Sequence, residues 1–289
     1  MLNFKKIEIS DIEIYNKYMQ NSEELSCENA FVNLLVWQPL YNNMIAEKDG
    51  ILFIKSGFEG DESFRLPYGD DLEKGVALIE SYSKTKPIFW TQEGANLERF
   101  KKIFGERFEL DAKRDAFDYI YLQSDLANLS GKKYHSKRNH ISAFSKKFDW
   151  HYETVNQSNM SAVAECAEQW YMENADRMDK TMLCEQKGID VMLSQMERLS
   201  VRGGAVFVDG KVVAFCLGSA INKNCFDVHI EKALSGFGEA YSVINREFAK
   251  NELSDFKYIN REDDLGIEGL RRAKLSYKPA ILLKKYECV

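Results

Sequence analysis

The sequence predicts an α/β protein with mixed sheets, in which one order of strands and helices occurs twice. Three observations lead to this prediction. Asp209-Gly210 joins two β-rich runs, and this dipeptide is the strongest short signal for a hairpin. The apolar run of residues 225–230 stops at a glycine-containing turn, residues 235–238, and a helical pattern follows at once. The order hairpin, strand, helix, strand, helix, strand can be read in both halves of the chain.

The first half opens with two helical segments and a hairpin. Residues 10–20 and 28–41 are predicted to be helices, and the second segment is strongly apolar. Lys48-Asp49-Gly50 separates two short apolar runs and predicts a second hairpin turn. The rest of this half is predicted as an extended piece at 64–69, a helix capped by Asp70-Asp71 and reaching residue 84, a strand at 87–92, a helix at 96–104 and two short strands within 108–122.

The second half repeats this order after a helical connection. Its predicted elements are a strand at 148–154, helices at 158–177 and 185–200, hairpin strands at 205–208 and 212–215, the strand and helix around the glycine turn, a strand at 256–260, a helix at 267–275 and a strand at 280–286. We therefore expect two domains, residues 1–124 and 125–289, without an obvious sequence repeat. A single α+β domain with an N-terminal helical extension is the alternative interpretation.

The composition indicates a globular, cytoplasmic protein. Of the 289 residues, 45% are hydrophobic and 29% are charged, and the net charge is −6. Any contact with nucleic acid would therefore need a local basic patch. No apolar run approaches the ~20 residues that cross a bilayer, and the N-terminus lacks the apolar core of a signal peptide. The six cysteines form no CxxC pair, which predicts reduced thiols and no zinc site.

One stretch departs from the acidic balance of the chain. Residues 132–147 contain six lysines and arginines and no aspartate or glutamate. Because arginine suits fork-like binding of phosphate, the stretch predicts contact with phosphates such as those of tRNA. A solvated helix face is an equally good interpretation. The residues expected to contact a substrate here are Lys132, Lys133, Lys137, Arg138 and Asn139.

The glycine turn of residues 235–238 is a candidate anion site. A strand that stops at a tight turn and opens into a helix leaves backbone N–H groups pointing outward, and the helix dipole favours negative charge there. Glycine also has no side chain to block the approach of a ligand. A plain connection between a strand and a helix explains the same pattern.

Acidic and basic residues follow the strand predicted at 256–260. Ligand sites of α/β sheets collect at such strand ends, and Arg271 and Lys274 share one face of the next helix. Acids followed by cations could hold an amine and a phosphate, although the same residues would also cap the helix and balance its dipole. The residues singled out in this segment are Asn260, Glu262, Asp263, Arg271 and Lys274.

Carboxylates and imidazoles are the side chains that most often remove a proton in catalysis. Glu231 and His229 alternate on the strand before the glycine turn, so they are expected to point the same way. His229 is also well explained as a half-buried structural residue. We expect Glu231 and Asp263 to be the catalytic carboxylates, and backbone N–H groups at the end of the same strand to hold an oxyanion.

The order of elements in the second half resembles the catalytic half of the GNAT acyltransferase fold. Two segments extend the resemblance: GKKYHSKRNHISAF, which begins at Gly131, and YINREDDLGIEGLRRAKLSYKPAILLKKY, which begins at Tyr258. Both resemble the phosphatidylglycerol lysyltransferase C-terminal domain family, which has a tandem pair of GNAT domains and is related to Fem-type aminoacyltransferases. The resemblance covers nearly the whole chain.

The resemblance implies a transferase of acyl or aminoacyl groups with no tightly bound cofactor. In the GNAT fold this glycine turn holds the pyrophosphate of the donor. Its usual pattern, Gln/Arg-x-x-Gly-x-Gly/Ala, is matched here by Gly236 and Gly238 but begins with Ala233. Aminoacyl-tRNA is therefore favoured over acyl-CoA as the donor. The residues that the resemblance assigns to donor binding are Gly236, Phe237, Gly238, Glu239 and Ala240.

The resemblance leaves the acceptor open. Characterised members of the family move an amino acid from tRNA to a lipid head group, and many carry a membrane flippase domain that we expect this stand-alone chain to lack. An amine, a lipid or a peptide could receive the acyl group. Two other functions stay open: an N-acetyltransferase that uses acyl-CoA, and a catalytically inactive tandem domain that binds a ligand or RNA.

Overall fold

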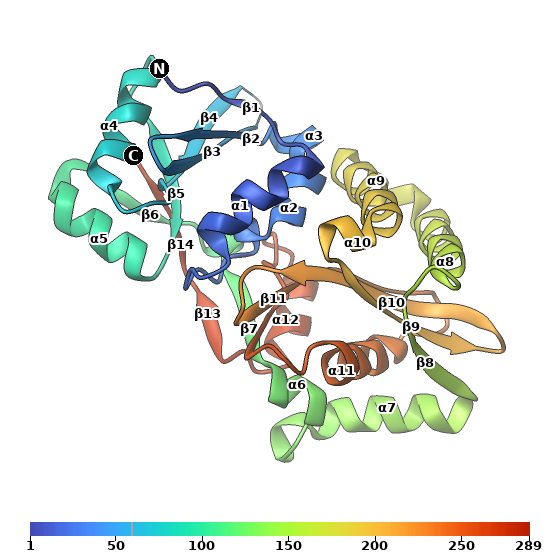
Figure 1. Cartoon of the computed structure of the whole chain (residues 1–289). Helices are drawn as coiled ribbons and strands as arrows, with labels where there is room; N and C mark the ends of the chain where they lie inside the picture. The colour runs from blue at the N-terminus through green and yellow to red at the C-terminus, as the bar shows by residue number, and fades with distance from the viewer. Residues whose placement is uncertain (59) are drawn as a thin grey trace.

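The computed structural model describes residues 1–58 and 60–289, and these residues form two mixed sheets of seven strands each (Figure 1). In pairing order, the first sheet contains β1 (Lys5–Lys6), β2 (Met44–Lys48), β3 (Ile51–Phe58), β4 (Asp61–Arg65), β5 (Ile88–Gln92), β14 (Lys285–Cys288) and β6 (Leu110–Ala112). The second contains β8 (Trp150–Thr154), β9 (Arg202–Val208), β10 (Lys211–Ala220), β11 (Cys225–Ala233), β12 (Tyr258–Asn260), β7 (Asp118–Leu122) and β13 (Ile281–Leu283).

The two sheets have the same arrangement of strands. Neighbouring strands are antiparallel in both, except for the fourth and fifth strands, which run parallel: β4 with β5, and β11 with β12. The sixth strand of each sheet comes from the other half of the chain, since β14 lies between β5 and β6, and β7 lies between β12 and β13. The predicted double use of one architecture is confirmed.

Because of this strand exchange, the two sheets do not correspond to the two segments 1–124 and 125–289 that the sequence predicts as domains. The strand predicted at 280–286 is in fact two strands in two sheets. Leu283 pairs with Asp118 in the second sheet, whereas Lys285 pairs with Gln92 in the first. The apolar run therefore crosses from one sheet to the other within two residues.

Helices fill the space around both sheets. They are α1 (Ile12–Met19), α2 (Phe31–Val36), α3 (Gln38–Tyr41), α4 (Leu72–Tyr82), α5 (Ala95–Phe104), α6 (Gln123–Asn128), α7 (His135–Lys147), α8 (Met160–Glu173), α9 (Lys180–Ser194), α10 (Met196–Leu199), α11 (Ala240–Glu252) and α12 (Glu268–Leu275). Among the described residues, no helix combines the length and the apolar character needed to cross a bilayer.

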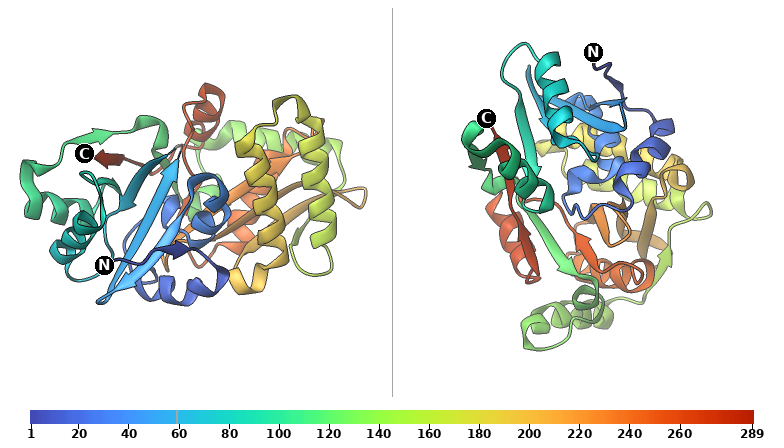
Figure 2. Two further views of the ribbon diagram at one scale, coloured as in Figure 1. Left: turned by 90° about the horizontal axis from the view of Figure 1, so that it is seen from above. Right: turned by 60° about the vertical axis from the view of Figure 1, so that its left-hand side comes forward.

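Three large apolar clusters and one small one, formed by Ala30, Ile221 and Cys225, make up the core of the described residues. The first lies under α4 and α5 on the first sheet. The second lies between the second sheet and α11, with α6 and α7 at its edge. The third lies on the opposite face of the second sheet, where α8 and α9 meet α1 and α2 (Figure 2). Because α1 and α2 belong to the first half and α8 and α9 to the second, this cluster joins the two halves.

Candidate active site

The short parallel strand β12 pairs only with the beginning of β11. The pairs run from Cys225 with Tyr258 to Asp227 with Asn260, and the rest of β11 has no partner on that side among the described residues. The sheet therefore opens toward the end of β11, where the glycine turn and α11 follow. This is the position at which ligand sites of such sheets collect.

The glycine turn is open on its outer side. Gly236 has φ +83°, and a Cβ atom at Gly236 or Gly238 would meet nothing within 4 Å. However, the N–H of Ser235 already donates to Glu173 Oε2 at 2.8 Å. The N–H groups of Phe237 and Ala240 donate to backbone carbonyls of the turn. A pyrophosphate at this turn would meet the carboxylate of Glu173.

Charged and aromatic side chains fill the opening between β11 and β12. The Arg261 guanidinium lies 2.7 Å from Glu231 Oε1, and Asn245 donates to Glu231 Oε2 at 3.0 Å. Lys137 of α7 reaches into the same space, with its Nζ 3.8 Å from the centre of the Tyr277 ring. Burial and the charge of Arg261 lower the pKa of Lys137 to about 8.

The rest of the basic stretch is less free to bind phosphate than its sequence indicates. Lys133 pairs with Asp125 at 2.9 Å. Arg138 donates to the backbone carbonyls of Leu129 and Gly131, so its guanidinium holds the loop after α6. The side chain of Asn139 lies 3.2 Å from His135 on the same helix. Lys132 is exposed and makes no ion pair among the described residues.

Glu231 and His229 do not face the same way. The pairing of β10 with β11 shifts by one residue between Leu217 and Gly218, which leaves His229 as an extra residue in β11. A bulge of this kind changes the alternation of side chains. His229 contacts Ser219 at 2.8 Å, whereas Glu231 is bound by Asn245 of α11. The expectation from strict alternation is wrong.

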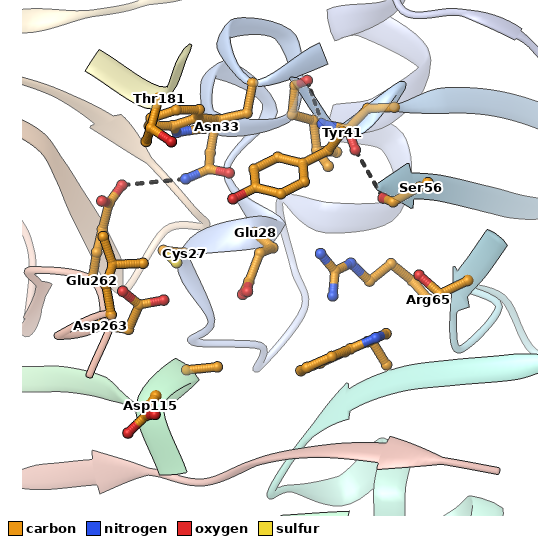
Figure 3. Close-up of a pocket in the computed structure, with 18 residues that line it drawn as sticks. Cys27, Glu28, Asn33, Tyr41, Ser56, Arg65, Asp115, Thr181, Glu262 and Asp263 are labelled. Carbon is orange, nitrogen blue, oxygen red and sulfur yellow. Dashed lines mark hydrogen bonds between the residues drawn. The ribbon is translucent and has the colours of Figure 1, made fainter. Parts of the chain in front are cut away.

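A cavity of about 510 Å³ lies between the two sheets (Figure 3). Its walls combine aromatic, acidic and basic side chains. They come from the first half of the chain, from the loop after β12 and from the start of α9. The charged and aromatic members are Glu28, Trp37, Tyr41, Arg65, Trp90, Asp115, Glu262 and Asp263.

The loop after β12 directs two predicted residues into this cavity. Glu262 has φ +56°, a strained value for a residue with a side chain, and the chain turns sharply there. Burial and the charge of Asp227 raise the pKa of Glu262 to about 7. Burial likewise raises the pKa of Asp263 to about 7. Asp263 makes no side-chain hydrogen bond or ion pair with any residue in the described ranges.

The other residues predicted near β12 have structural partners. Asn260 donates to Leu25 O at 2.7 Å and to Asp118 Oδ2 at 2.8 Å. Arg271 pairs with Asp264 at 2.9 Å. The Nζ of Lys274 donates to the backbone carbonyls of residues 261 and 263, which holds the loop that carries the two acids.

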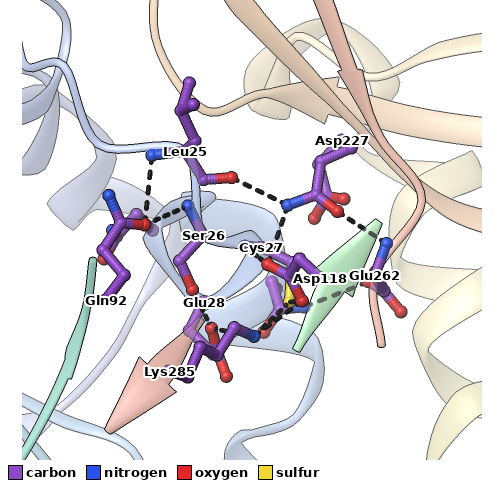
Figure 4. Close-up of polar contacts among 12 residues, drawn as sticks. Leu25, Ser26, Cys27, Glu28, Gln92, Asp118, Asp227, Glu262 and Lys285 are labelled. Atoms are coloured by element: carbon purple, nitrogen blue, oxygen red, sulfur yellow. Dashed lines mark hydrogen bonds and ion pairs between the residues drawn. The ribbon is translucent and has the colours of Figure 1, made fainter. Parts of the chain in front are cut away.

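A buried charge network lies behind the cavity (Figure 4). The Nζ of Lys285 lies 2.7 Å from both Glu28 Oε2 and Asp118 Oδ1, and 3.4 Å from Cys27 Sγ. Cys27, Glu28 and Asp118 have the donor atoms and spacing of a metal site. The Lys285 ammonium already supplies a positive charge at that position.

A second group of possible metal ligands shares Cys27. Its other members are Asp227 and Glu262, whose donor atoms lie within 4.8 Å of one another and of the thiol. His229 Nδ1 lies 3.2 Å from Asp227 Oδ2 and 3.5 Å from Glu262 Oε1. Burial opposes the charge of His229, but the two carboxylates outweigh it and raise its pKa to about 9. An imidazolium therefore balances this group in part.

Most of the cavity wall carries no signal in the sequence. Nothing local to Glu28 or Arg65 indicates that either side chain lines a cavity together with the loop after β12. Asp118, Asp227 and Lys285 did carry a signal, since each is a charged residue within an apolar strand. All three are fully or almost fully buried. Such residues are rare in a core unless they are paired.

The two matching sheets, each with one parallel pair formed by its fourth and fifth strands, define a tandem GNAT fold of the acyltransferase type. The chain belongs to the family described as phosphatidylglycerol lysyltransferase, C-terminal, whose model matches residues 20–289. The predicted family and fold class are thereby confirmed.

Solved structures support the same fold. A conserved protein of unknown function from Bacteroides thetaiotaomicron is 36% identical, with a TM-score of 0.92 over 100% of this chain and 99% of that one. L-PGS from Bacillus licheniformis is 13% identical, with a TM-score of 0.64 over 98% and 92% of the two chains. FemX is 9% identical, with a TM-score of 0.59 over 99% and 96%.

One curated relative is also similar in sequence. An uncharacterized protein of Mycoplasmoides gallisepticum is 22% identical over 171 residues, which are 58% of this chain. The match spans 54% of that relative's length.

Proposed function

We propose that this protein is an aminoacyltransferase, which moves an amino acid from its ester on tRNA to the nitrogen of an amine. The observation that carries the proposal is the segment of residues 261–263. Arg261 lies in the opening of the second sheet, whereas Glu262 and Asp263 line the cavity between the sheets. One short loop therefore joins the charged side chains in the opening of the second sheet to the cavity between the sheets, which supports a transferase with two substrates.

The donor side of the proposal is the opening of the second sheet. Lys132, Lys137, Lys146 and Lys147 lie on or beside α7, and Lys137 reaches into the opening itself. Phosphates of a tRNA acceptor end would be attracted by these charges. The carboxylate of Glu173, which accepts from the N–H of Ser235 in the glycine turn, would repel a nucleotide pyrophosphate there. It does not cover α7. This contrast supports tRNA over acyl-CoA.

The acceptor side is the cavity, with Asp263 as the base. A carboxylate with a pKa of about 7 is ionised in part at neutral pH and can take a proton from an entering ammonium. The free amine nitrogen then forms a bond with the acyl carbon, and the bond from that carbon to the ester oxygen breaks. The second proton of the nitrogen ends on the released ribose hydroxyl. Glu231 is less suited to this role, since Arg261 and Asn245 already bind both of its oxygens.

A transfer assay tests the proposal. The protein is mixed with a set of tRNAs charged with radiolabelled amino acids and with a panel of amines, and formation of a base-stable amide is followed. Acetyl-CoA is offered in a parallel reaction. Amide formed only from aminoacyl-tRNA supports the proposal. Transfer from acetyl-CoA alone would indicate an N-acetyltransferase. Binding without turnover of either donor would indicate an inactive binding domain.

A further inference from the structure

Two charged side chains of the cavity form no close ion pair and no side-chain hydrogen bond with the residues that the structure describes. Arg65 makes no ion pair or hydrogen bond with any residue that the structure describes, and its Nε is buried without a partner. Asp263 likewise lacks a side-chain partner there. The two side chains extend from opposite walls (Figure 3). A buried charge without a close partner costs free energy. A ligand group of the opposite charge would therefore be stabilised at each wall.

The nearest charged groups balance these two side chains only in part. Glu28 lies between the walls; burial opposes its charge, but the charges of Lys285 and Arg65 both lower its pKa. Its Oε2, however, is already 2.7 Å from the Nζ of Lys285. On the other wall, Glu262 adds a second carboxylate beside Asp263. One wall of the cavity is therefore negatively charged, through Asp263 and Glu262, and the opposite wall carries the positive charge of Arg65.

We propose that the cavity binds a small zwitterion of the amino-acid class, a free amino acid or a short peptide. Its carboxylate lies at Arg65, whose planar guanidinium matches two carboxylate oxygens. Its ammonium has three N–H donors and lies between Asp263 and Glu262. Trp37 and Trp90 cover the carbon atoms of the ligand. The volume of about 510 Å³ is within the ~300–1,000 Å³ of small-ligand pockets.

Ligands with a single charge fit less well. A phosphate at Arg65 would also face the carboxylates of Glu28, Glu262 and Asp263. A simple amine at Asp263 would leave Arg65 without a partner. This inference deepens the proposed function, because it places the ammonium of the zwitterion at the proposed base. It rests on the proposed function only where it makes the zwitterion the acceptor.

Calorimetry with chemically modified ligands tests the charge assignment on the unmodified protein. A panel of L-amino acids and dipeptides is titrated first. The tightest binder is then compared with its methyl ester, which lacks the carboxylate, and with its N-acetyl derivative, which lacks the ammonium. Each modification is expected to weaken binding by about 10- to 100-fold, the range for a charged hydrogen-bond partner.

Paired protein variants locate each charge. In Arg65→Met, the free acid is expected to bind about 10- to 100-fold more weakly, while the methyl ester binds as it does to wild type. Asp263→Asn should bind the ligand with a free ammonium more weakly than wild type does, whereas its affinity for the N-acetyl derivative should be unchanged. Arg272→Met is the matched control, because Arg272 is 76% exposed on α12, and it should change nothing. Circular dichroism verifies that each variant is folded.

Two results would overturn the inference. One is equal affinity of wild type for the acid, its ester and its N-acetyl derivative, a comparison that needs no variant. The other is binding of inorganic phosphate that is lost in Arg65→Met while no amino acid or dipeptide binds. The proposed function can fail independently of this inference. If a zwitterion binds but is never acylated, the inference holds and the proposed function is wrong. If only amines without a carboxylate are acylated, the proposed function holds and the inference is wrong.

Discussion

The Nζ of Lys285 lies 2.7 Å from Oδ1 of Asp118, so a single ion pair joins the two strands that exchange sheets. Both side chains are buried, at 2% and 0% exposure. Burial opposes the charge of Lys285, but Asp118, Cys27 and Glu28 outweigh it and raise its pKa well above the ordinary value. The pair also adjoins the cavity through Glu28, which links the strand exchange to the candidate active site.

Replacing Lys285 by alanine should destabilise the whole protein. The change leaves two buried carboxylates without their cation, which costs about 3–5 kcal/mol for a broken buried pair. Urea denaturation followed by circular dichroism measures the loss. Lys284→Ala is the matched control, because the Lys284 side chain is half exposed and its nearest carboxylate, that of Glu93, is as far as 3.8 Å away. Its effect should stay within about 1 kcal/mol. Equal effects of the two variants would contradict the role assigned to Lys285.

Asp263→Asn should lower the turnover number by about 10²–10⁴-fold, because the amide cannot take up the proton of the acceptor. In wild type, the rate should fall as the pH drops below about 7, where the base becomes protonated. Steady-state kinetics of the transfer reaction across pH 5–9 measure both effects. Glu231→Gln is the discriminating variant. A larger loss in Glu231→Gln than in Asp263→Asn would move the role of base to Glu231.

The sequence was sufficient to predict most elements and the double architecture, because these follow from local periodicity and turn signals. Asp71 caps α4 by accepting from the N–H of Lys74, as predicted. The strand exchange could not be predicted, since residues 281–288 form one continuous segment in the sequence whether they enter one sheet or two.

The candidate site was predictable only where its residues are consecutive in the chain. Glu262 and Asp263 were found because acids cluster after a strand. Arg65 and Glu28 were missed because the sequence does not show that they line the same cavity as Glu262 and Asp263, which are far away in the chain. Arg138 was overrated, since its bonds to two carbonyls cannot be recognised from charge alone.

If α7 contacts tRNA, loss of its free lysines should weaken binding and reduce its salt dependence. The triple variant Lys132→Ala, Lys146→Ala and Lys147→Ala should flatten the slope of log affinity against log salt by ~0.7–0.9 for each lost phosphate contact. Arg138 is left intact because it holds the preceding loop. Fluorescence titration with tRNA at several salt concentrations measures the slope. Lys84→Ala with Lys102→Ala, two exposed lysines of the first half, is the control. An unchanged slope in the triple variant would make α7 an ordinary solvated helix.

Gly238→Trp should block the donor without unfolding the protein. A Cβ atom at Gly238 meets nothing within 4 Å, and its φ is not in the left-handed region, so a large side chain would enter the opening without backbone strain. Donor binding should fall by at least tenfold while the thermal midpoint stays near that of wild type. Gly269→Trp is the matched control, since Gly269 also has open space and an unstrained φ. Full donor binding by Gly238→Trp would place the donor elsewhere.

Stability should depend on pH through His229. Its folded-state pKa of about 9 exceeds the unfolded value near 6.5, so its stabilisation is complete below pH 6.5 and disappears as the pH rises through 9. Glu262 acts in the same direction at lower pH, since its raised pKa favours the protonated form in the folded state. Urea midpoints between pH 6.5 and 9 should therefore decline in wild type and decline less in His229→Gln. The exposed His151, replaced by glutamine, should not alter the decline. A parallel decline in wild type and His229→Gln would contradict the charge assigned to His229.

The position of β14 also sets the order of events during synthesis. The ribosome adds residues 285–288 after all the other strands of the first sheet, yet these residues lie between β5 and β6. Until they emerge, β5 and β6 each lack the neighbour that their backbone groups require. The N-terminal half therefore cannot complete its sheet as it leaves the ribosome, in contrast to the domain-by-domain folding that is usual for long chains. Nascent chains stalled before residue 285 should stay sensitive to protease in both halves.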